Sequence, residues 1–289
     1  MKIMINGVDA DIRTENEKTL GEVLSVLDGW LCGSGYRLSG LNVNGETINA
    51  GSVESFFYRD IDTVETLDIS ASSLPQLLAE SYLNLIQDID EYETLNIDDK
   101  PMFIENWKES PQAGMLSEQS PDIYNLAVKT FSGEFIGNSL PSELPESSDP
   151  PLRLFALERF RELQDPVSEF KRIESLVLNV CLKLEEIPLD FQTGKDASAM
   201  EKINCFSGIA EKIFRIISIL KLGSYPINEI TVNDMPLGAY INEFDAALRE
   251  MLAANERSDT ILVGDIAEYE MAPRLRGLYA SIFDYIKGE

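Results

Sequence analysis

The side chains of this chain that could do chemistry are mainly its carboxylates, because the chain contains no histidine. Imidazole is the base in Ser-His-Asp and Cys-His catalysis and a common ligand of zinc and haem. Its absence excludes those kinds of nucleophilic catalysis and most sites of those metals. The three cysteines, Cys32, Cys181 and Cys205, are odd in number and far apart. This pattern predicts buried free thiols of a reducing compartment, and neither a disulfide framework nor a metal cluster.

Two stretches approach known ligand-binding loops and fail at the residues that matter. A phosphate-binding Walker A loop would need glycine where Leu189 stands and Ser or Thr where Asp196 stands. A calcium loop starting at Asp88 would need glycine where Glu93 stands and a bidentate Glu where Asp99 stands. We therefore predict no catalytic residues, no cofactor site and no metal site.

Carboxylates are also the main source of charge, since 50 acidic residues against 24 basic ones give a net charge of −26. Such a chain repels nucleic acid and anionic lipid, which are bound through Lys and Arg. Two explanations of this acidity remain: it serves solubility alone, or it attracts a basic protein partner. A run of acids where a helix is predicted to end makes Asp88, Asp90 and Glu91 the candidate interaction surface.

A magnesium-dependent hydrolase with a carboxylate site in the helical half is the alternative. All-α nucleoside triphosphate pyrophosphatases place a Glu-Glu pair a few turns ahead of Glu-x-x-Asp. Glu185-Glu186 fits the first half of that pattern, but Glu256 and Asp259 lie beyond a further predicted helix. The acidic set Asp265, Glu268 and Glu270 could also chelate a cation, although a solvated helix face explains it as well.

The helices that must position these residues are clearest between Asp165 and Leu222. Asp165-Pro166 predicts a helix start and Pro188 its stop. Ser198 with Glu201 fits the capping box of a second, antiparallel helix, and Gly223 a C-cap. Apolar side chains recur every three or four residues, which predicts one buried face per helix. They are Phe170, Ile173, Leu176, Val177, Val180, Cys181, Leu184 and Ile187, then Ile203, Phe206, Ile209, Ile213, Ile216, Ile217 and Leu220.

Shorter helices are predicted on either side of this pair. One opens at Ser73, others cover residues 122–131 and 152–163, and one is capped at Asn233 or Asp234. Another starts at Asp259 and is broken or kinked by Pro273, before a last helix over 275–286. Residues 101–121 are expected to be irregular, and the Pro/Ser-rich stretch 132–151 to form a loop. The basic cluster Arg153, Arg159 and Arg161 lies beside Glu158 and Glu162, which predicts internal charge pairing.

The first seventy residues alternate between strands and one helix. Asn6-Gly7 and Asn44-Gly45 each lie between strand-like runs and predict type I′ hairpins. Thr19 with Glu22 predicts a capping box. A helical stripe follows it, made of Val23, Val26, Leu27, Trp30 and Leu31.

With its closing strand at 63–69, the segment 1–70 resembles the ubiquitin-like β-grasp superfamily in the order of its elements. The resemblance implies a β-grasp fold that serves as a binding module. Ubiquitin and the sulfur carriers end in an exposed Gly-Gly, whereas here Ile69 continues through Ser70–Ser73 into a helix. The resemblance therefore does not extend to conjugation or sulfur transfer.

We expect an α+β protein with a β-grasp domain at residues 1–72 and a larger all-α bundle at 73–289. The polar N-terminus lacks the apolar run of a signal peptide, and no stretch is long and apolar enough to span a bilayer. These features predict a cytoplasmic, bacterial, non-enzymatic adaptor or scaffold that binds other proteins through its β-grasp module or its acidic helical surface. The sequence specifies no oligomeric state.

Overall fold

The computed structural model describes residues 1–12, 16–48, 53–133, 151–222 and 225–288. The chain divides into two compact units, Met1–Ser81 and Tyr82–Glu289. The division lies inside a helix that follows the last strand of the first unit, a few residues beyond the boundary at 72 expected from the sequence.

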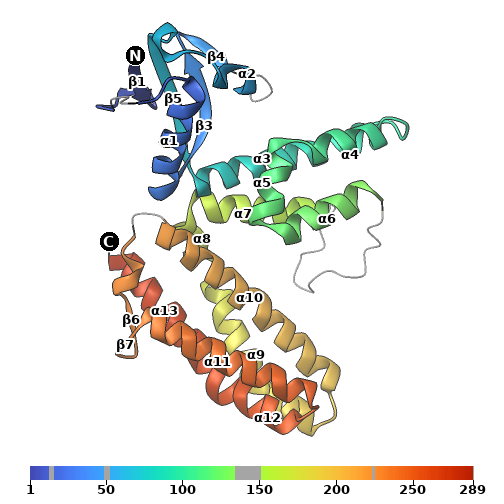
Figure 1. Ribbon diagram of the computed structural model, residues 1–289. Coiled ribbons are helices and arrows are strands. Elements are labelled where there is room, and N and C mark those ends of the chain that lie inside the picture. The colour runs from blue at the N-terminus through green and yellow to red at the C-terminus, as the bar shows by residue number, and fades with distance from the viewer. Residues whose placement is uncertain (13–15, 49–52, 134–150, 223–224, 289) are drawn as a thin grey trace. The chain divides into compact units, whose positions relative to one another are not determined.

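The N-terminal unit is a five-stranded mixed sheet with one long helix, α1 (Leu20–Gly33), beside it (Figure 1). The strands are β1 (Lys2–Ile5), β2 (Val8–Asp9), β3 (Tyr36–Val43), β4 (Glu46–Ile48) and β5 (Thr66–Ser73). Their order across the sheet is β2-β1-β5-β3-β4. Strands β1 and β5 are parallel, and the other neighbours are antiparallel. A short helix, α2 (Val53–Phe57), follows β4.

Both predicted Asn-Gly turns form. The φ angles are 54° and 75° at Asn6-Gly7 and 52° and 84° at Asn44-Gly45, as a type I′ turn requires. The asparagine side chains also bond to the central strand region. Asn6 accepts from the backbone N–H of Ala71 at 2.8 Å and donates to its carbonyl at 3.0 Å, while Asn44 Oδ1 accepts from the N–H of Glu65 at 2.7 Å. These hydrogen bonds thus join the two hairpin turns to the rest of the sheet.

Helix α1 begins with the predicted capping box, in which Thr19 and Glu22 bond to each other's backbone. Its buried side consists of Leu20, Val23, Leu24, Leu27 and Leu31. The predicted stripe was too wide, because Val26 and Trp30 are 58% and 57% exposed. At 100° per residue Val26 lies on the far side of the helix from Leu24, whereas Trp30 lies at the edge of the buried face.

The second unit begins within α3 (Leu74–Thr94) and continues through α4 (Lys100–Lys108), α5 (Pro111–Gln119), α6 (Pro121–Phe131) and α7 (Pro151–Gln164). The expectation of irregular structure over 101–121 was wrong. Its prolines start helices instead of breaking them, because Pro111 and Pro121 occupy first positions, where no backbone donor is needed.

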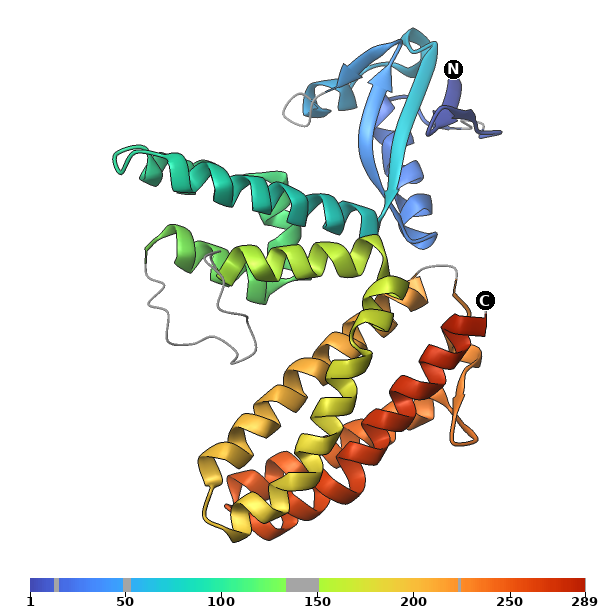
Figure 2. The ribbon, with the colours of Figure 1, turned by 180° about the vertical axis from the view of Figure 1, so that it is seen from behind.

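The C-terminal part is a helical bundle. Its helices are α8 (Pro166–Arg172), α9 (Glu174–Gln192), α10 (Asp196–Leu222), α11 (Leu237–Glu256), α12 (Thr260–Asp265) and α13 (Ala272–Gly288). In Figure 2, α9 runs between α10 and α13. Apolar residues from all six helices form one core, which includes every predicted stripe residue except Leu176, which is 49% exposed.

Three predicted boundaries in the bundle were wrong. The first predicted helix is two, α8 and α9, because the chain breaks at Ile173. Pro188 does not stop α9, which continues to Gln192. The bare backbone of Gly264 packs on Pro188, where an added Cβ would come within 3.2 Å of its Cα. Ser198 lies inside α10 and donates to Asp190 at 2.8 Å.

Asp165 caps α8 and Asp259 caps α12, as predicted. Asn233 and Asp234 cap no helix. They have φ angles of 50° and 63° in the turn between two short strands, β6 (Thr231–Val232) and β7 (Met235–Pro236). Pro273 follows a π-helical turn at Ile266–Met271, which accommodates the irregular hydrogen bonding near a proline.

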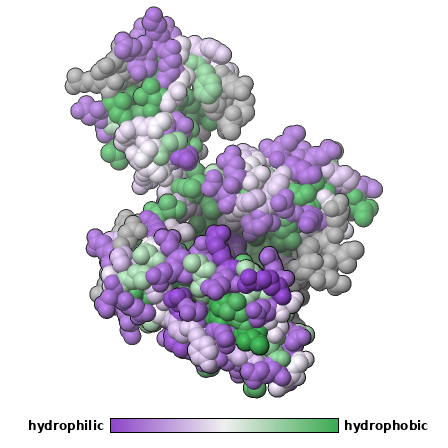
Figure 3. Space-filling view, turned by 60° about the horizontal axis from the view of Figure 1, so that its bottom comes forward, coloured by the Kyte–Doolittle hydropathy of each residue, from purple (hydrophilic) through white to green (hydrophobic). Residues whose placement is uncertain are grey.

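Gly223 and most of the predicted 132–151 loop lie outside the described residues. Among the helices that are described, none is both long and apolar enough to cross a membrane. Hydrophilic residues cover much of the surface seen in Figure 3, and an apolar patch interrupts them on the helical unit.

Candidate functional site

The three acidic residues selected from the sequence lie on two different sides of α3. Asp88 and Glu91 are three positions apart and share a face. Asp90 points elsewhere, and its Oδ1 accepts a hydrogen bond from Arg153 Nε of α7 at 3.0 Å. The predicted surface is therefore divided into a pair that lines a pocket and one residue that connects two helices.

The pocket lies between α3, α4 and the start of α5 and has a volume of about 260 Å³. It is lined by Asp88 and Glu91 of α3 and by Phe103 and Trp107 of α4, and Asn106, Ser110 and Gln112 complete the lining.

Asp88 is held in a defined orientation. Trp107 Nε1 donates to its Oδ2 at 3.0 Å and Gln112 Nε2 donates to the same oxygen at 3.4 Å. Burial raises the pKa of Asp88, and the two donors oppose that shift. Both donors use Oδ2, so Oδ1 has no donor among the described residues and can accept a hydrogen bond from a bound group.

The aromatic lining belongs to a packed cluster. Trp107 stacks on Tyr124 with ring centroids 5.6 Å apart and meets the edge of Phe131 at 5.1 Å, while Phe103 lies 5.5 Å from Phe131. Tyr92 of α3 joins the cluster, and Lys100 places its Nζ 4.3 Å from the Tyr92 ring centre. The cluster thus already makes one cation–π contact within the chain.

Paired carboxylates beside aromatic rings are suited to binding a cation. Carboxylates supply charge-assisted hydrogen bonds, and the ring faces attract positive charge. The sequence identified the acids as a candidate interaction surface. It missed the pocket because α4 and α5 were not predicted there.

The carboxylates of the hydrolase alternative have separate structural roles. Glu185 pairs with Arg276, Glu186 with Lys202, and Glu270 with Arg274, while Asp259 is a helix cap. Over the described ranges, no three Cys, Asp or Glu side chains are grouped so that they could hold a metal ion. The hydrolase remains a prediction that no arrangement of these residues favours.

None of the three cysteines is in a disulfide. The predicted burial holds for Cys181 and Cys205 but was wrong for Cys32, which is partly exposed. Burial raises the pKa of Cys181 to about 11, which keeps that thiol protonated and unreactive at neutral pH.

A buried ionic network joins α7 to α10. Glu162 is 1% exposed and accepts two hydrogen bonds from Arg215, at 3.0 and 3.1 Å. Lys212 Nζ lies 2.6 Å from Glu158 and 3.2 Å from Glu162. The predicted pairing of Arg159 with Glu162 is present at 3.7 Å, but the closer partners come from a helix about fifty residues away along the chain.

Comparisons with known proteins match two separate segments of the chain. Residues 1–73 match a family model described as the TP0873 N-terminal domain, which ends where β5 ends. Residues 169–281 match one described as a domain of unknown function (DUF8042), which covers most of the α8–α13 bundle. An uncharacterized protein of Treponema pallidum (strain Nichols) is 20% identical over 278 residues, 96% of this chain and 94% of the relative. No solved structure matches.

Proposed function

We propose that the protein is a non-enzymatic adaptor that binds a protein partner by accepting one of its basic side chains in the α3–α4–α5 pocket. The observation that carries this proposal is that Asp88 and Glu91 line one pocket together with Phe103 and Trp107. An arginine or lysine side chain entering there meets two acceptors beside the half-buried ring of Phe103.

The energies suit a specific but reversible contact. A hydrogen bond to a charged group contributes about 1.5–3 kcal/mol, and a cation–π contact about 0.5–2 kcal/mol, depending on desolvation. The net charge of −26 also attracts basic partners over longer distances and raises their association rate.

We further infer that the N-terminal unit is a β-grasp domain and serves the adaptor as a second binding module. The parallel β1–β5 pair at the centre, flanked by two hairpins with one helix beside the sheet, supports this inference. Strand β5 ends at Ser73, directly before α3. The segment therefore has no carboxyl terminus that could be activated, and binding is the role that fits.

Tryptophan fluorescence can test the pocket, because the chain has only two tryptophans, Trp30 and Trp107. In a Trp30→Phe variant, all of the tryptophan emission comes from Trp107. The probes are the peptide acetyl-Gly-Gly-Arg-Gly-Gly-amide and its neutral isostere with citrulline. We expect saturable changes in emission with the arginine peptide and affinity about tenfold weaker, or about 1.4 kcal/mol, with citrulline.

Glu91→Gln should weaken binding of the arginine peptide about tenfold, and binding should also weaken as salt rises, since screening acts over about 10 Å at 0.1 M. Glu93→Gln is the matched control, because Glu93 is exposed on the same helix and does not line the pocket. Equal binding of both peptides, or equal affinities of the Glu91 and Glu93 variants, would contradict the proposal.

A further inference from the structure

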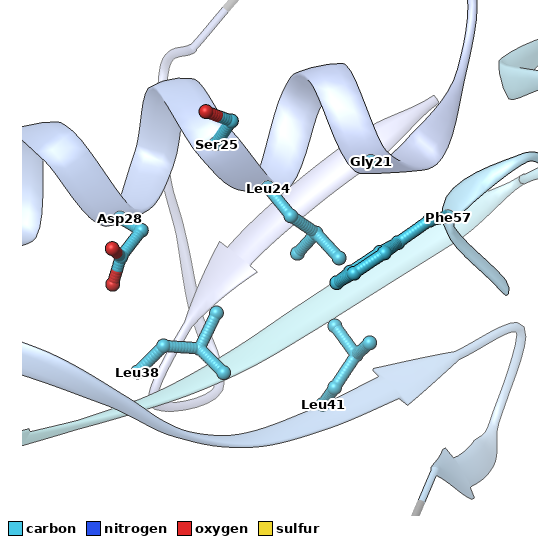
Figure 4. Close-up of a pocket in the computed structure, with 7 residues that line it drawn as sticks. All are labelled: Gly21, Leu24, Ser25, Asp28, Leu38, Leu41 and Phe57. Atoms are coloured by element: carbon cyan, nitrogen blue, oxygen red, sulfur yellow. The ribbon is translucent and has the colours of Figure 1, made fainter. Parts of the chain in front are cut away.

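The N-terminal unit has a second cavity, a groove between α1 and β3. Its volume is about 440 Å³, within the range of about 300–1,000 Å³ that is usual for ligand sites. The floor and walls are apolar: Leu24 of α1, Leu38 and Leu41 of β3, and Phe57 of α2. Figure 4 shows these four side chains pointing toward one another.

The groove has two chemically different ends. Phe57, which is 39% exposed, closes one end. At the other end the carboxylate of Asp28 lies near Leu38 (Figure 4), and among the residues that the structure describes Asp28 is the only charged one lining the groove. Its contact within the chain is a weak one from the Cys32 thiol at 3.8 Å, so the carboxylate remains open to a stronger donor.

Gly21 is the residue that places Phe57 at the groove. A Cβ at this position would lie 2.9 Å from the Phe57 carbonyl oxygen and 3.0 Å from its Cβ. Glycine in a helix costs about 1 kcal/mol relative to alanine, and here it permits α2 to approach α1. The backbone bond from Leu20 N–H to the Arg59 carbonyl, at 2.8 Å, holds the chain after Phe57 in the same place.

The opposite face of the sheet differs in chemistry. Ser39 and Ser72 share a hydrogen bond at 2.9 Å across neighbouring strands, and Asn42 donates to Thr47 at 3.4 Å. Small polar side chains that bond to one another offer little apolar area. The groove is therefore the better docking surface of this unit.

We propose that the groove docks a segment of a protein partner that presents a large apolar side chain followed, one helical turn later, by Lys or Arg. The apolar side chain fills the space between Leu24, Leu41 and Phe57, and the cation pairs with Asp28. Charge complementarity selects this occupant, because acidic residues outnumber basic ones in residues 1–73 and no basic side chain of the described ranges lines the groove. Burying an amphipathic helix in an apolar groove is a common form of peptide recognition.

This inference rests on the proposed adaptor function and assigns it a second recognition surface. The test uses the full chain with labelled leucine methyl groups and NMR detection. The probe is an alanine-based peptide with one leucine and one lysine four positions later. We expect saturable shifts of the Leu24, Leu38 and Leu41 methyl signals, and affinity about tenfold lower for Asp28→Asn or for a probe with norleucine in place of lysine.

Gly21→Ala should also weaken binding, because it displaces Phe57. Gly29→Ala is its matched control, since an added Cβ at Gly29 meets nothing within 4 Å. Unshifted leucine signals, or equal affinities for wild type and Asp28→Asn, would overturn the groove assignment. Binding that is lost in Glu91→Gln but kept in Asp28→Asn would also overturn it and would leave the adaptor proposal standing.

Discussion

At the scale of single residues, Glu162 shows how burial competes with pairing. Arg215 and Lys212 both bond to it, and those contacts favour the charged carboxylate. Desolvation of a side chain that is 1% exposed is the larger effect, and it raises the pKa of Glu162 to about 7. A carboxyl group that binds its proton more tightly in the folded state makes stability depend on pH.

The sign of that dependence follows from the raised pKa. The stabilisation of the fold by this bound proton is fully present below pH 4.5, the ordinary pKa of a glutamate. It is lost as the pH rises through about 7. We expect wild type to lose stability between these limits relative to Glu162→Gln. Urea unfolding at pH 5, 6, 7 and 8 measures this difference. If the unfolding free energies of the two proteins changed equally with pH, the prediction would be contradicted. Glu186→Gln, at an exposed carboxylate, is the control.

At the scale of elements, α9 and α10 form the antiparallel pair on which the bundle core is built. Ile213 of α10 is completely buried among apolar residues of the neighbouring helices. Leu189 of α9, in contrast, is 61% exposed although it is equally apolar. Hydrophobicity alone therefore does not decide which side chain stabilises the bundle; its position on the helix does.

Ile213→Ala should destabilise the protein by about 2–5 kcal/mol, because it removes buried aliphatic volume and leaves a cavity. Leu189→Ala should change stability by about 0.5 kcal/mol or less, as surface substitutions usually do. Chemical denaturation of both variants measures the difference. Similar unfolding midpoints for the two would show that the core does not depend on Ile213.

At the scale of the whole molecule, the N-terminal unit has a complete core of its own. Ile3, Leu20, Leu27, Leu67 and Ile69 are buried together with other residues of the sheet and α1. The match to a family model ends at Ser73, which agrees with a unit that closes at β5.

We expect residues 1–81 expressed alone to fold, with dispersed amide NMR signals and a cooperative unfolding transition. A shorter fragment that ends at residue 60, and so lacks β5, is the control and should not fold, since β5 pairs with both β1 and β3. A collapsed amide spectrum for residues 1–81 would show that the unit depends on the helices that follow.

The sequence by itself determined the features that depend on near neighbours. The Asn6-Gly7 turn, the Thr19–Glu22 capping box, the Asp165 cap and the stripe through Ile213 are all as predicted, because backbone geometry and helical period act over a few residues. The α+β class follows from them.

Of the candidate site, the sequence supplied the acids but not their grouping. Only the tertiary structure paired Asp90 with Arg153 and placed Trp107 against Asp88. It alone buried Glu162 beneath Arg215 and packed Gly264 against Pro188. These outcomes depend on residues from about twenty to more than seventy positions apart in sequence, and packing between distant elements is not encoded in local periodicity.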